Sequence, residues 1–269
     1  MPELPEVETI VRQLGSKIAN KDISQAEVFD SQMVDQEISK LVPFKIISIW
    51  RRGKAIILGL DNNKFLYVHL RMSGHFYYAK EGETANLEEH KHTMVAKFTF
   101  ADGSQLSHNS IRRFGHIHLL DADQLQKELQ KYGPEPLNNE FSAEKFQELL
   151  HSRRNANIKT LLMDQSFIAG IGNIYAQEAL YLAKINPQRK AGSLSPEESK
   201  LLYNKLLYIL KLAIKHNGST VDNYTNIEGS GGFQKYLTVY GRSKCPQGHE
   251  IVKLNLGGRG TSYCPQCQH

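Results

Sequence analysis

Residues 133–136 read Gly-Pro-Glu-Pro, and this stretch separates two parts of the chain that carry different patterns. Proline lacks a backbone donor and restricts the residue before it, so two prolines beside a glycine end regular structure. Short β-branched and aromatic runs precede this stretch, and helical patterns follow it. The sequence therefore predicts an α+β protein with a boundary near residues 130–137, an antiparallel β-sandwich or barrel before it and a helical region after it.

The part before the boundary begins with one helix and continues in strands. Apolar residues from Val7 to Ile18 recur at spacings of three and four, which indicates the buried face of a helix. Polar residues 80–89 predict an exposed loop between strands. Runs rich in β-branched and aromatic residues predict strands at 45–50, 55–60, 64–69 and 94–100.

The part after the boundary has helical periodicity and then a glycine-rich segment. Ser142 and Ser195 precede acidic residues and are expected to cap helices, because a hydroxyl accepts from free amides at a helix start. Residues 226–233, with three glycines, predict a mobile loop. The helices are expected at 142–151, 158–163, 173–184 and 196–216. The predicted domains are 1–132, 138–226 and 235–269.

Composition limits the class of protein. The chain has 269 residues, 40% of them hydrophobic, which is enough for two domains with ordinary cores. A net charge of +5 permits a polyanionic partner without requiring one. Glu3, Glu6 and Glu8 stand where a signal peptide needs basic residues, and Lys211 interrupts the apolar run at 206–214. We expect a soluble, cytoplasmic protein with no membrane span.

All three cysteines lie near the C-terminal end of the sequence. Cys245, Cys264 and Cys267 cannot all pair in disulfides, and His249 follows the first of them by four residues. This spacing predicts one structural zinc ion held by three thiolates and one imidazole, which would hold together a hairpin too small to have its own core. His269 is the rival fourth ligand, although ordering a terminal residue costs more entropy.

Three further groups of residues are candidates for functional sites. Removal of Met1 would make the Pro2 nitrogen a secondary amine. The pKa of such an amine lies roughly 2 units below that of a lysine side chain, so more of it is unprotonated and nucleophilic near neutrality. Glu3, the next residue, could donate or accept a proton. A helix start with proline and glutamate is the alternative interpretation. Met72 and Phe114 lie among arginines and could wedge into a duplex, or simply belong to the core. The turn before Asn173 could bind a phosphate at a helix start, but no strand precedes it, which disfavours a nucleotide cofactor.

Seven segments taken in order carry a resemblance to a known family. They are MPELPEVET, RRGK, HLRMSG, RRFG, GPEPL, GIGNIYAQEAL and GRGTSYCPQCQ. Together they resemble the formamidopyrimidine-DNA glycosylase family along the whole chain. The resemblance implies an N-terminal β-sandwich, a helical domain with a helix-two-turns-helix motif and a zinc ribbon. It also implies a monomeric DNA-repair enzyme, both glycosylase and abasic-site lyase, that removes oxidised purines from damaged double-stranded DNA through a Schiff base.

The resemblance implies a role for individual residues. Pro2 would be the nucleophile and Glu3 the general acid and base, while Lys54 would stand at the position of the family's catalytic lysine. Arg259 would contact the DNA backbone and assist the elimination, and the loop at 226–233 would close over the flipped base. The wedge would comprise Met72, Arg112 and Phe114, and the phosphate contacts His90, Arg154, Lys159 and Asn173.

The sequence departs from the family pattern in three places. Residues 109–111 read Asn-Ser-Ile before Arg112, Lys91 stands where an aspartate is frequent, and Gly248 and His249 replace the second cysteine of the finger. Two alternative functions stay open on the sequence. One is a glycosylase of the endonuclease VIII type, specific for oxidised pyrimidines, and the other is a binder of damaged DNA that does not cut it.

Overall fold

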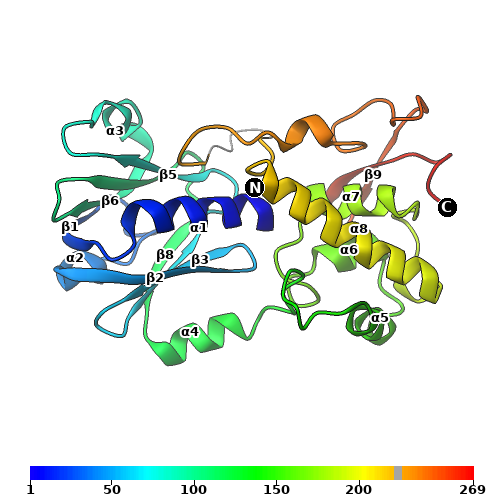
Figure 1. Cartoon of the computed structure of the whole chain (residues 1–269), viewed down its shortest axis with the longest axis horizontal. Coiled ribbons are helices and arrows are strands. Elements are labelled where there is room, and N and C mark those ends of the chain that lie inside the picture. The colour runs from blue at the N-terminus through cyan, green and yellow to red at the C-terminus, as the bar shows by residue number, and fades with distance from the viewer. Residues whose placement is uncertain (221–225) are drawn as a thin grey trace. The chain divides into compact units, whose positions relative to one another are not determined.

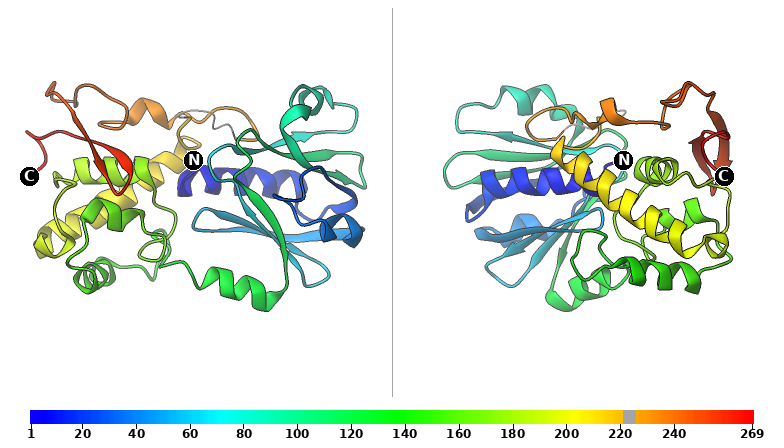
Figure 2. Two further views of the ribbon diagram at one scale, coloured as in Figure 1. Left: turned by 180° about the vertical axis from the view of Figure 1, so that it is seen from behind. Right: turned by 45° about the vertical axis from the view of Figure 1, so that its right-hand side comes forward.

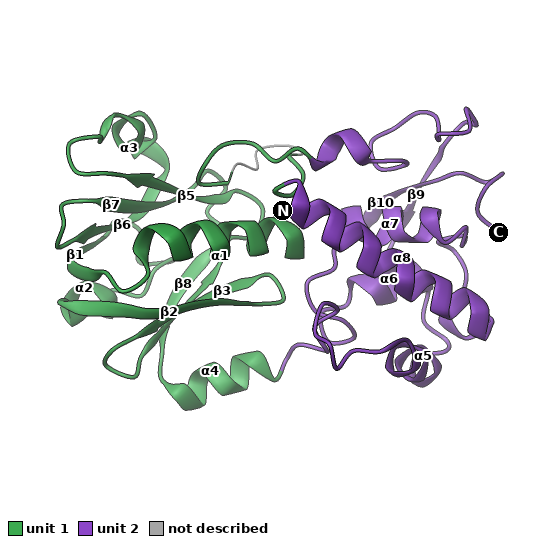
Figure 3. Ribbon diagram, viewed as in Figure 1, with its two compact units in different colours: residues 1–130, 217–232 green, residues 131–216, 233–269 purple. Residues whose placement is uncertain are grey.

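The computed structural model describes residues 1–220 and 226–269, which divide into two compact units (Figure 3). Unit 1 comprises residues 1–130 and 217–232, and unit 2 comprises residues 131–216 and 233–269. The predicted break at 133–136 follows the first boundary directly. Residues 217–232 belong to unit 1 because of contacts with residues far away in the sequence. The sequence patterns did not predict this assignment.

Unit 1 is an antiparallel β-sandwich with a long helix packed against it (Figure 1). The strands follow the order β5-β7-β6-β1-β2-β3-β4-β8, and β1 joins the two halves through a short pairing with β2. Its helices are α1 (Leu4–Ile18), α2 (Glu37–Leu41), α3 (Ala85–Glu89), η1 (Lys91–Thr93) and α4 (Ala122–Leu129). Its strands are β1 (Asp22–Val28), β2 (Phe44–Arg52), β3 (Ala55–Leu60), β4 (Phe65–His69), β5 (Gly74–Ala79), β6 (Met94–Phe100), β7 (Gln105–Ser110) and β8 (His116–Leu120).

The core of unit 1 lies between α1 and the two halves of the sheet. Ile10 and Leu14 of α1 are fully buried, as the helical spacing predicts. They share one cluster with Ile56 from β3 and with Phe76 and Phe98 from the other half. Side chains from both halves therefore fill one interior, which confirms the predicted sandwich.

One prediction for unit 1 needs correction. Residues 80–89 do not form a loop throughout, because α3 occupies Ala85–Glu89. Leu87 is the one buried residue of this short helix. A single apolar residue in a polar stretch forms no periodic pattern, so the sequence did not predict the helix.

Unit 2 is helical and carries a two-stranded hairpin (Figure 2). Helix α7 packs against α6, α8 and β10, so it connects the helices with the hairpin. The capping predictions are confirmed: Ser142 Oγ accepts from Lys145 N, and Ser195 Oγ accepts from Glu198 N, each at 3.2 Å. The elements are α5 (Ala143–Ser152), α6 (Ile158–Met163), α7 (Asn173–Leu182), η2 (Ala191–Ser193), α8 (Pro196–Lys215), η3 (Phe233–Tyr236), β9 (Val252–Leu256) and β10 (Arg259–Tyr263).

Across residues 1–220 and 226–269, no helix is long and apolar enough to cross a bilayer.

Candidate nucleic-acid interface and metal centre

The N-terminal residues of unit 1 are held by a buried carboxylate. Pro2 is buried and Glu3 is only 3% exposed, directly before α1 begins. Glu6 Oε2 accepts the N–H of Glu3 at 2.8 Å, and its other oxygen accepts the N–H of Ser219 at 2.7 Å. Glu6 therefore fixes the backbone beside Pro2 and attaches it to the segment that starts at residue 217. The sequence placed Glu6 near Pro2 but gave no sign of its distant partner.

Helix α1 also holds the glycine-rich segment predicted as a mobile loop. Gln13 is buried, and its Nε2 donates to Asn226 Oδ1 at 3.2 Å. Its Oε1 accepts the N–H of Ile227 at 3.0 Å. One glutamine thus anchors the beginning of residues 226–233, and Phe233 at the end of this range is fully buried in unit 2. Both ends of this stretch are therefore attached to folded parts of the chain.

A cluster of basic side chains lies at one end of strands β3 and β4. Lys54 is 5% exposed and precedes Ala55, which pairs with His69. Burial first, and then the charges of Arg71, His116 and Lys54, lower the pKa of His69 to about 3. His69 Nδ1 accepts the N–H of Arg71 at 3.1 Å, so a neutral ring carries its proton on Nε2. An anionic ligand at this cluster would meet the positive charges of Lys54 and Arg71 and the neutral N–H donor of His69.

Two neighbouring turns present the predicted wedge residues. Met72 is 39% exposed between β4 and β5, and Phe114 is 56% exposed between β7 and β8. Arg112 Cζ lies 5.3 Å from the centre of the Phe114 ring, and the N–H of Arg112 donates to Ser73 Oγ at 2.9 Å. Two large apolar side chains therefore lie at the surface and not in the core, on turns that are joined by a hydrogen bond.

The backbone at the tips of these turns is unusual. Arg71 and Arg113 have φ values of 53° and 49°, which lie in the left-handed region that residues with a Cβ rarely adopt. Gly115 lets the two turns approach closely, since a Cβ there would lie 2.8 Å from the carbonyl oxygen of His69. Such local strain is typical of functional turns. The exposed Met72 and Phe114 each follow one of these strained residues directly.

Three predicted phosphate contacts lie at separate places in the two units. In unit 1, the ring of His90 stacks on Tyr77 with a centroid distance of 4.2 Å. In unit 2, Arg154 is exposed and its carbonyl oxygen accepts from Gly192 N. Lys159 is fully buried in α6. The burial of Lys159 sets it apart from the other two, and its role in binding phosphate stays a prediction.

The first turn of α7 contacts the hairpin that carries Arg259. Asn173, at the start of α7, donates from Nδ2 to the carbonyl oxygen of Gly260 at 3.1 Å. Gln177 lies one turn further along and is 1% exposed. Its Oε1 accepts the N–H of Ser262 at 2.6 Å. Asn173 and Arg259, which the sequence singled out separately, thus belong to one bonded region.

A second buried carboxylate of α7 holds the segment that leads into the finger. Glu178 is fully buried, and its two oxygens accept from the N–H groups of Thr238, Val239 and Tyr240 at 2.8–3.0 Å. The hydroxyl of Thr238 also donates to Glu178, at 2.5 Å. The sequence showed an acidic residue within an apolar helix but not its partners about 60 residues later.

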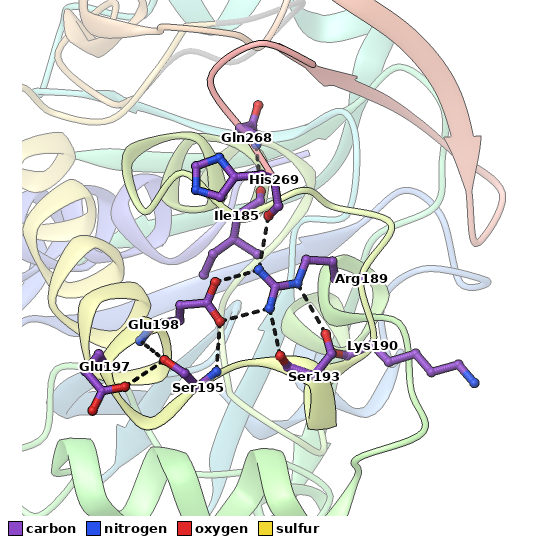
Figure 4. Close-up of polar contacts among 9 residues, drawn as sticks. All are labelled: Ile185, Arg189, Lys190, Ser193, Ser195, Glu197, Glu198, Gln268 and His269. Carbon is purple, nitrogen blue, oxygen red and sulfur yellow. Dashed lines mark hydrogen bonds and ion pairs between the residues drawn. The ribbon is translucent and has the colours of Figure 1, made fainter.

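The end of the finger is bonded to the segment between α7 and α8 (Figure 4). Arg189 forms a bidentate ion pair with Glu198 at 2.6 and 2.8 Å, and its Nη1 also donates to the carbonyl oxygen of His269 at 3.1 Å. Gln268 Nε2 donates to the Ile185 carbonyl oxygen at 2.9 Å. Bidentate pairs of this kind fix geometry strongly, so this pair keeps the end of the chain beside the start of α8.

Four side chains of the finger form a metal centre. The ligand atoms of Cys245, His249, Cys264 and Cys267 all lie within 4.8 Å of one another. His249 Nδ1 lies 3.3 Å from Cys267 Sγ and 3.7 Å from Cys264 Sγ, and the sulfurs of Cys245 and Cys267 are 4.0 Å apart. A tetrahedral ion with Zn–S bonds of about 2.3 Å has sulfur–sulfur edges of about 3.8 Å. The donor set therefore fits one structural zinc ion, with His249 in place of a fourth cysteine.

The β-sandwich, the helices and the zinc hairpin define a class of proteins, which comparison with known families identifies. Three family models match: the formamidopyrimidine-DNA glycosylase N-terminal domain over residues 1–117, its H2TH domain over 132–225, and the zinc finger found in FPG and IleRS over 243–269. The chain belongs to the formamidopyrimidine-DNA glycosylase family.

Individual relatives cover the whole chain. The formamidopyrimidine-DNA glycosylase of Pelotomaculum thermopropionicum is 40% identical, over 100% of this chain and 99% of that protein. A crystal structure of a Lactococcus lactis FPG variant with DNA containing Fapy-dG has a TM-score of 0.89 and 37% identity, and covers 99% of each chain. A structure of MutM with DNA containing carbocyclic 8-oxo-G has a TM-score of 0.89 and 36% identity, again over 99% of each chain.

Proposed function

We propose that this protein is a base-excision repair enzyme that removes oxidised purines from damaged duplex DNA and then cuts the strand at the abasic site. The relatives that cover the full chain are named formamidopyrimidine-DNA glycosylases, and two solved ones hold DNA with Fapy-dG or an 8-oxoguanine analogue. The observation that carries the proposal is the pair Pro2 and Glu3, buried before α1 with its backbone fixed by Glu6. A protein that only binds DNA has no need of such an amine.

The proposed chemistry begins at the Pro2 nitrogen, which is a free secondary amine once Met1 is removed. The damaged nucleotide leaves the stack, and the amine attacks C1′ of its sugar. The bond from C1′ to the base breaks and the amine loses its proton, which leaves C1′ bonded to the Pro2 nitrogen and to O4′. The C1′–O4′ bond then breaks, with Glu3 supplying the proton to O4′, and an iminium ion forms between C1′ and the nitrogen. The iminium acidifies the C2′ proton, and loss of this proton expels the 3′ phosphate; a second elimination expels the 5′ phosphate. Lys54 and Arg259 stabilise the phosphates, since cations favour a leaving anion.

The remaining predicted residues hold the DNA. Met72 and Phe114 enter the duplex where the nucleotide has left, with Arg112 beside them. Phosphates are held by His90, Arg154, Lys159 and Asn173, without reading of base sequence. Zinc has a structural role, because it holds together the hairpin that carries Arg259. The protein acts as a cytoplasmic monomer, with catalysis in residues 1–132, DNA binding in 138–226 and the finger in 235–269.

Borohydride trapping tests this function. A duplex with 8-oxoguanine should give a covalent protein–DNA adduct, and Pro2→Gly should reduce the adduct at least a hundredfold. Intact-mass measurement must show that Met1 is absent, because Pro2 is otherwise an amide and cannot attack. A duplex with thymine glycol serves as the comparison substrate. Preferred cleavage of thymine glycol, or tight binding with no adduct, would contradict the proposal.

A further inference from the structure

Gln177 connects helix α7 with the finger through both ends of its side-chain amide. Its Oε1 accepts the N–H of Ser262 at 2.6 Å, and its Nε2 lies 3.3 Å from the carbonyl oxygen of Gly260. The same Nε2 donates to the Asn173 carbonyl oxygen at 2.7 Å, which orients the amide. Because Gln177 is 1% exposed, water does not readily replace these bonds.

The carbonyl oxygen of Gly260 is a shared acceptor. Asn173 Nδ2 donates to it at 3.1 Å, from the first turn of α7. Gly260 follows Arg259 in β10, so this carbonyl lies one residue from the proposed phosphate-binding arginine. The Arg259 side chain itself is exposed. The backbone on one side of Arg259 is therefore held by Asn173 and Gln177, while its guanidinium extends to solvent.

A glycine turn lies on the other side of Arg259. Gly257 and Gly258 form this turn between β9 and β10, with φ values of 59° and 73°. A Cβ at Gly257 would lie 2.8 Å from the Thr160 methyl group, so the turn passes close to α6. Positive φ at both residues is the geometry of a tight two-residue hairpin turn, which glycine adopts without steric cost. Pairing with β9 fixes the register of Arg259 within the hairpin, with Arg259 opposite Leu256. The bonds that α7 makes to β10 fix the hairpin, and with it Arg259, on the helix.

We propose that Gln177 is a positioning residue, which fixes the finger hairpin on α7 so that Asn173 and Arg259 bind the DNA backbone as one unit. This inference rests on the proposed function, because it takes both residues as phosphate contacts. On this proposal the buried Gln177 determines whether the Arg259 guanidinium reaches its phosphate.

The salt dependence of binding distinguishes positioning from simple stabilisation. The slope of log K against log salt falls by about 0.9 for each phosphate that a protein cation ceases to neutralise. Gln177 is uncharged, so its removal changes the slope only if Arg259 leaves its phosphate. Gln177→Ala should weaken binding to a duplex with tetrahydrofuran, an uncleavable abasic analogue, about tenfold, which corresponds to the loss of two or three hydrogen bonds. It should lower the slope by about 0.9, as Arg259→Ala should.

The double variant completes the test. After Arg259→Ala, the further change Gln177→Ala should weaken binding less than about threefold and leave the slope unchanged. Gln177→Met, which keeps the side-chain volume, should behave as Gln177→Ala. Gln124→Ala is the matched control: Gln124 Oε1 accepts the N–H of Asp121 in unit 1, and the slope should stay at the wild-type value.

Each variant is measured with zinc bound, its metal content confirmed and its melting temperature recorded. An unchanged slope in both Gln177 variants, or losses that simply add to those of Arg259→Ala, would overturn the inference. The borohydride adduct separates this failure from failure of the proposed function. If wild-type protein forms the adduct and the slopes do not move, the enzyme assignment stands and the role of Gln177 falls.

Discussion

Replacing Glu178 by alanine should detach the segment that leads into the finger. The carboxylate accepts from four donors on residues 238–240, and the substitution leaves all of them without it. Val239 is fully buried, so its N–H meets no water, and an unsatisfied buried donor costs about 1–3 kcal/mol. Thr238 and Tyr240 are half-buried and lose only the net value of their bonds to a charged group, about 1–2 kcal/mol together after partial hydration.

The sum predicts that Glu178→Ala lowers the free energy of unfolding of unit 2 by about 4 kcal/mol. Glu178→Gln keeps one acceptor oxygen and should lose about half as much. Urea unfolding of the zinc-loaded protein measures both values, and hydrogen exchange at the amides of residues 238–240 locates the change. Glu148→Ala is the matched control, because Glu148 makes an exposed ion pair with Lys145 on α5 and should change stability by less than about 0.5 kcal/mol. A loss below about 1 kcal/mol with these amides still protected in Glu178→Ala would refute the reasoning.

Three further predictions concern metal, wedge and pH. His249→Ala should lose the single zinc ion and weaken DNA binding, while unit 1 and the helices of unit 2 stay folded. His269→Ala should retain the metal. Metal analysis with circular dichroism checks both variants, and full zinc content in His249→Ala would contradict the ligand set. Met72→Ala and Phe114→Ala should each slow excision of 8-oxoguanine at least tenfold. Each should weaken binding to an abasic duplex less than threefold, because no base remains to be evicted. Equal losses in both measurements would show that these residues only stabilise the fold. Burial and nearby histidines lower the pKa of His108 to about 3 from 6.5, so the unfolded chain binds more protons between these values and stability falls as pH drops through this range. His108→Phe should therefore remove about 3 kcal/mol of the loss of stability between pH 7 and pH 4, measured by urea unfolding at both pH values. An unaltered pH dependence in this variant would exclude His108 as its source.

The sequence patterns located elements that are apolar and periodic. The predictions for 55–60, 94–100 and 158–163 coincide with β3, β6 and α6, because β-branched or helical spacing is strong there. Strand β7 has the opposite character, since Ser107, His108 and Asn109 are polar and yet fully buried. Ser107 Oγ donates to Asn109 Oδ1 at 2.7 Å, and the Asn109 amide donates to the His90 carbonyl oxygen at 2.8 Å. Local alternation of apolar and polar residues cannot reveal a strand that carries polar side chains at its buried positions.

The same distinction holds at the site. The sequence could single out Pro2 and Lys54 because they stand in short, specific segments, and Cys245 because it stands at a metal-ligand spacing from His249. The residues that hold them, such as Glu6 and Glu178, accept bonds from backbone groups that lie 213 and about 60 residues away. A backbone donor leaves no mark on the amino-acid sequence, so these partners became evident only in the folded chain.

The histidine in the metal centre has a consequence for oxidative chemistry. Oxidants that damage guanine also convert cysteine thiolates to sulfenic acids and disulfides, and an imidazole ligand takes no part in that series of reactions. With Cys245, Cys264 and Cys267 as the only thiols of the chain, one sulfur always stays outside any internal disulfide. Internal disulfides therefore cannot cross-link all the sulfurs of this finger. As long as the third sulfur stays a thiolate, reduction of a single disulfide restores all three thiolates for zinc.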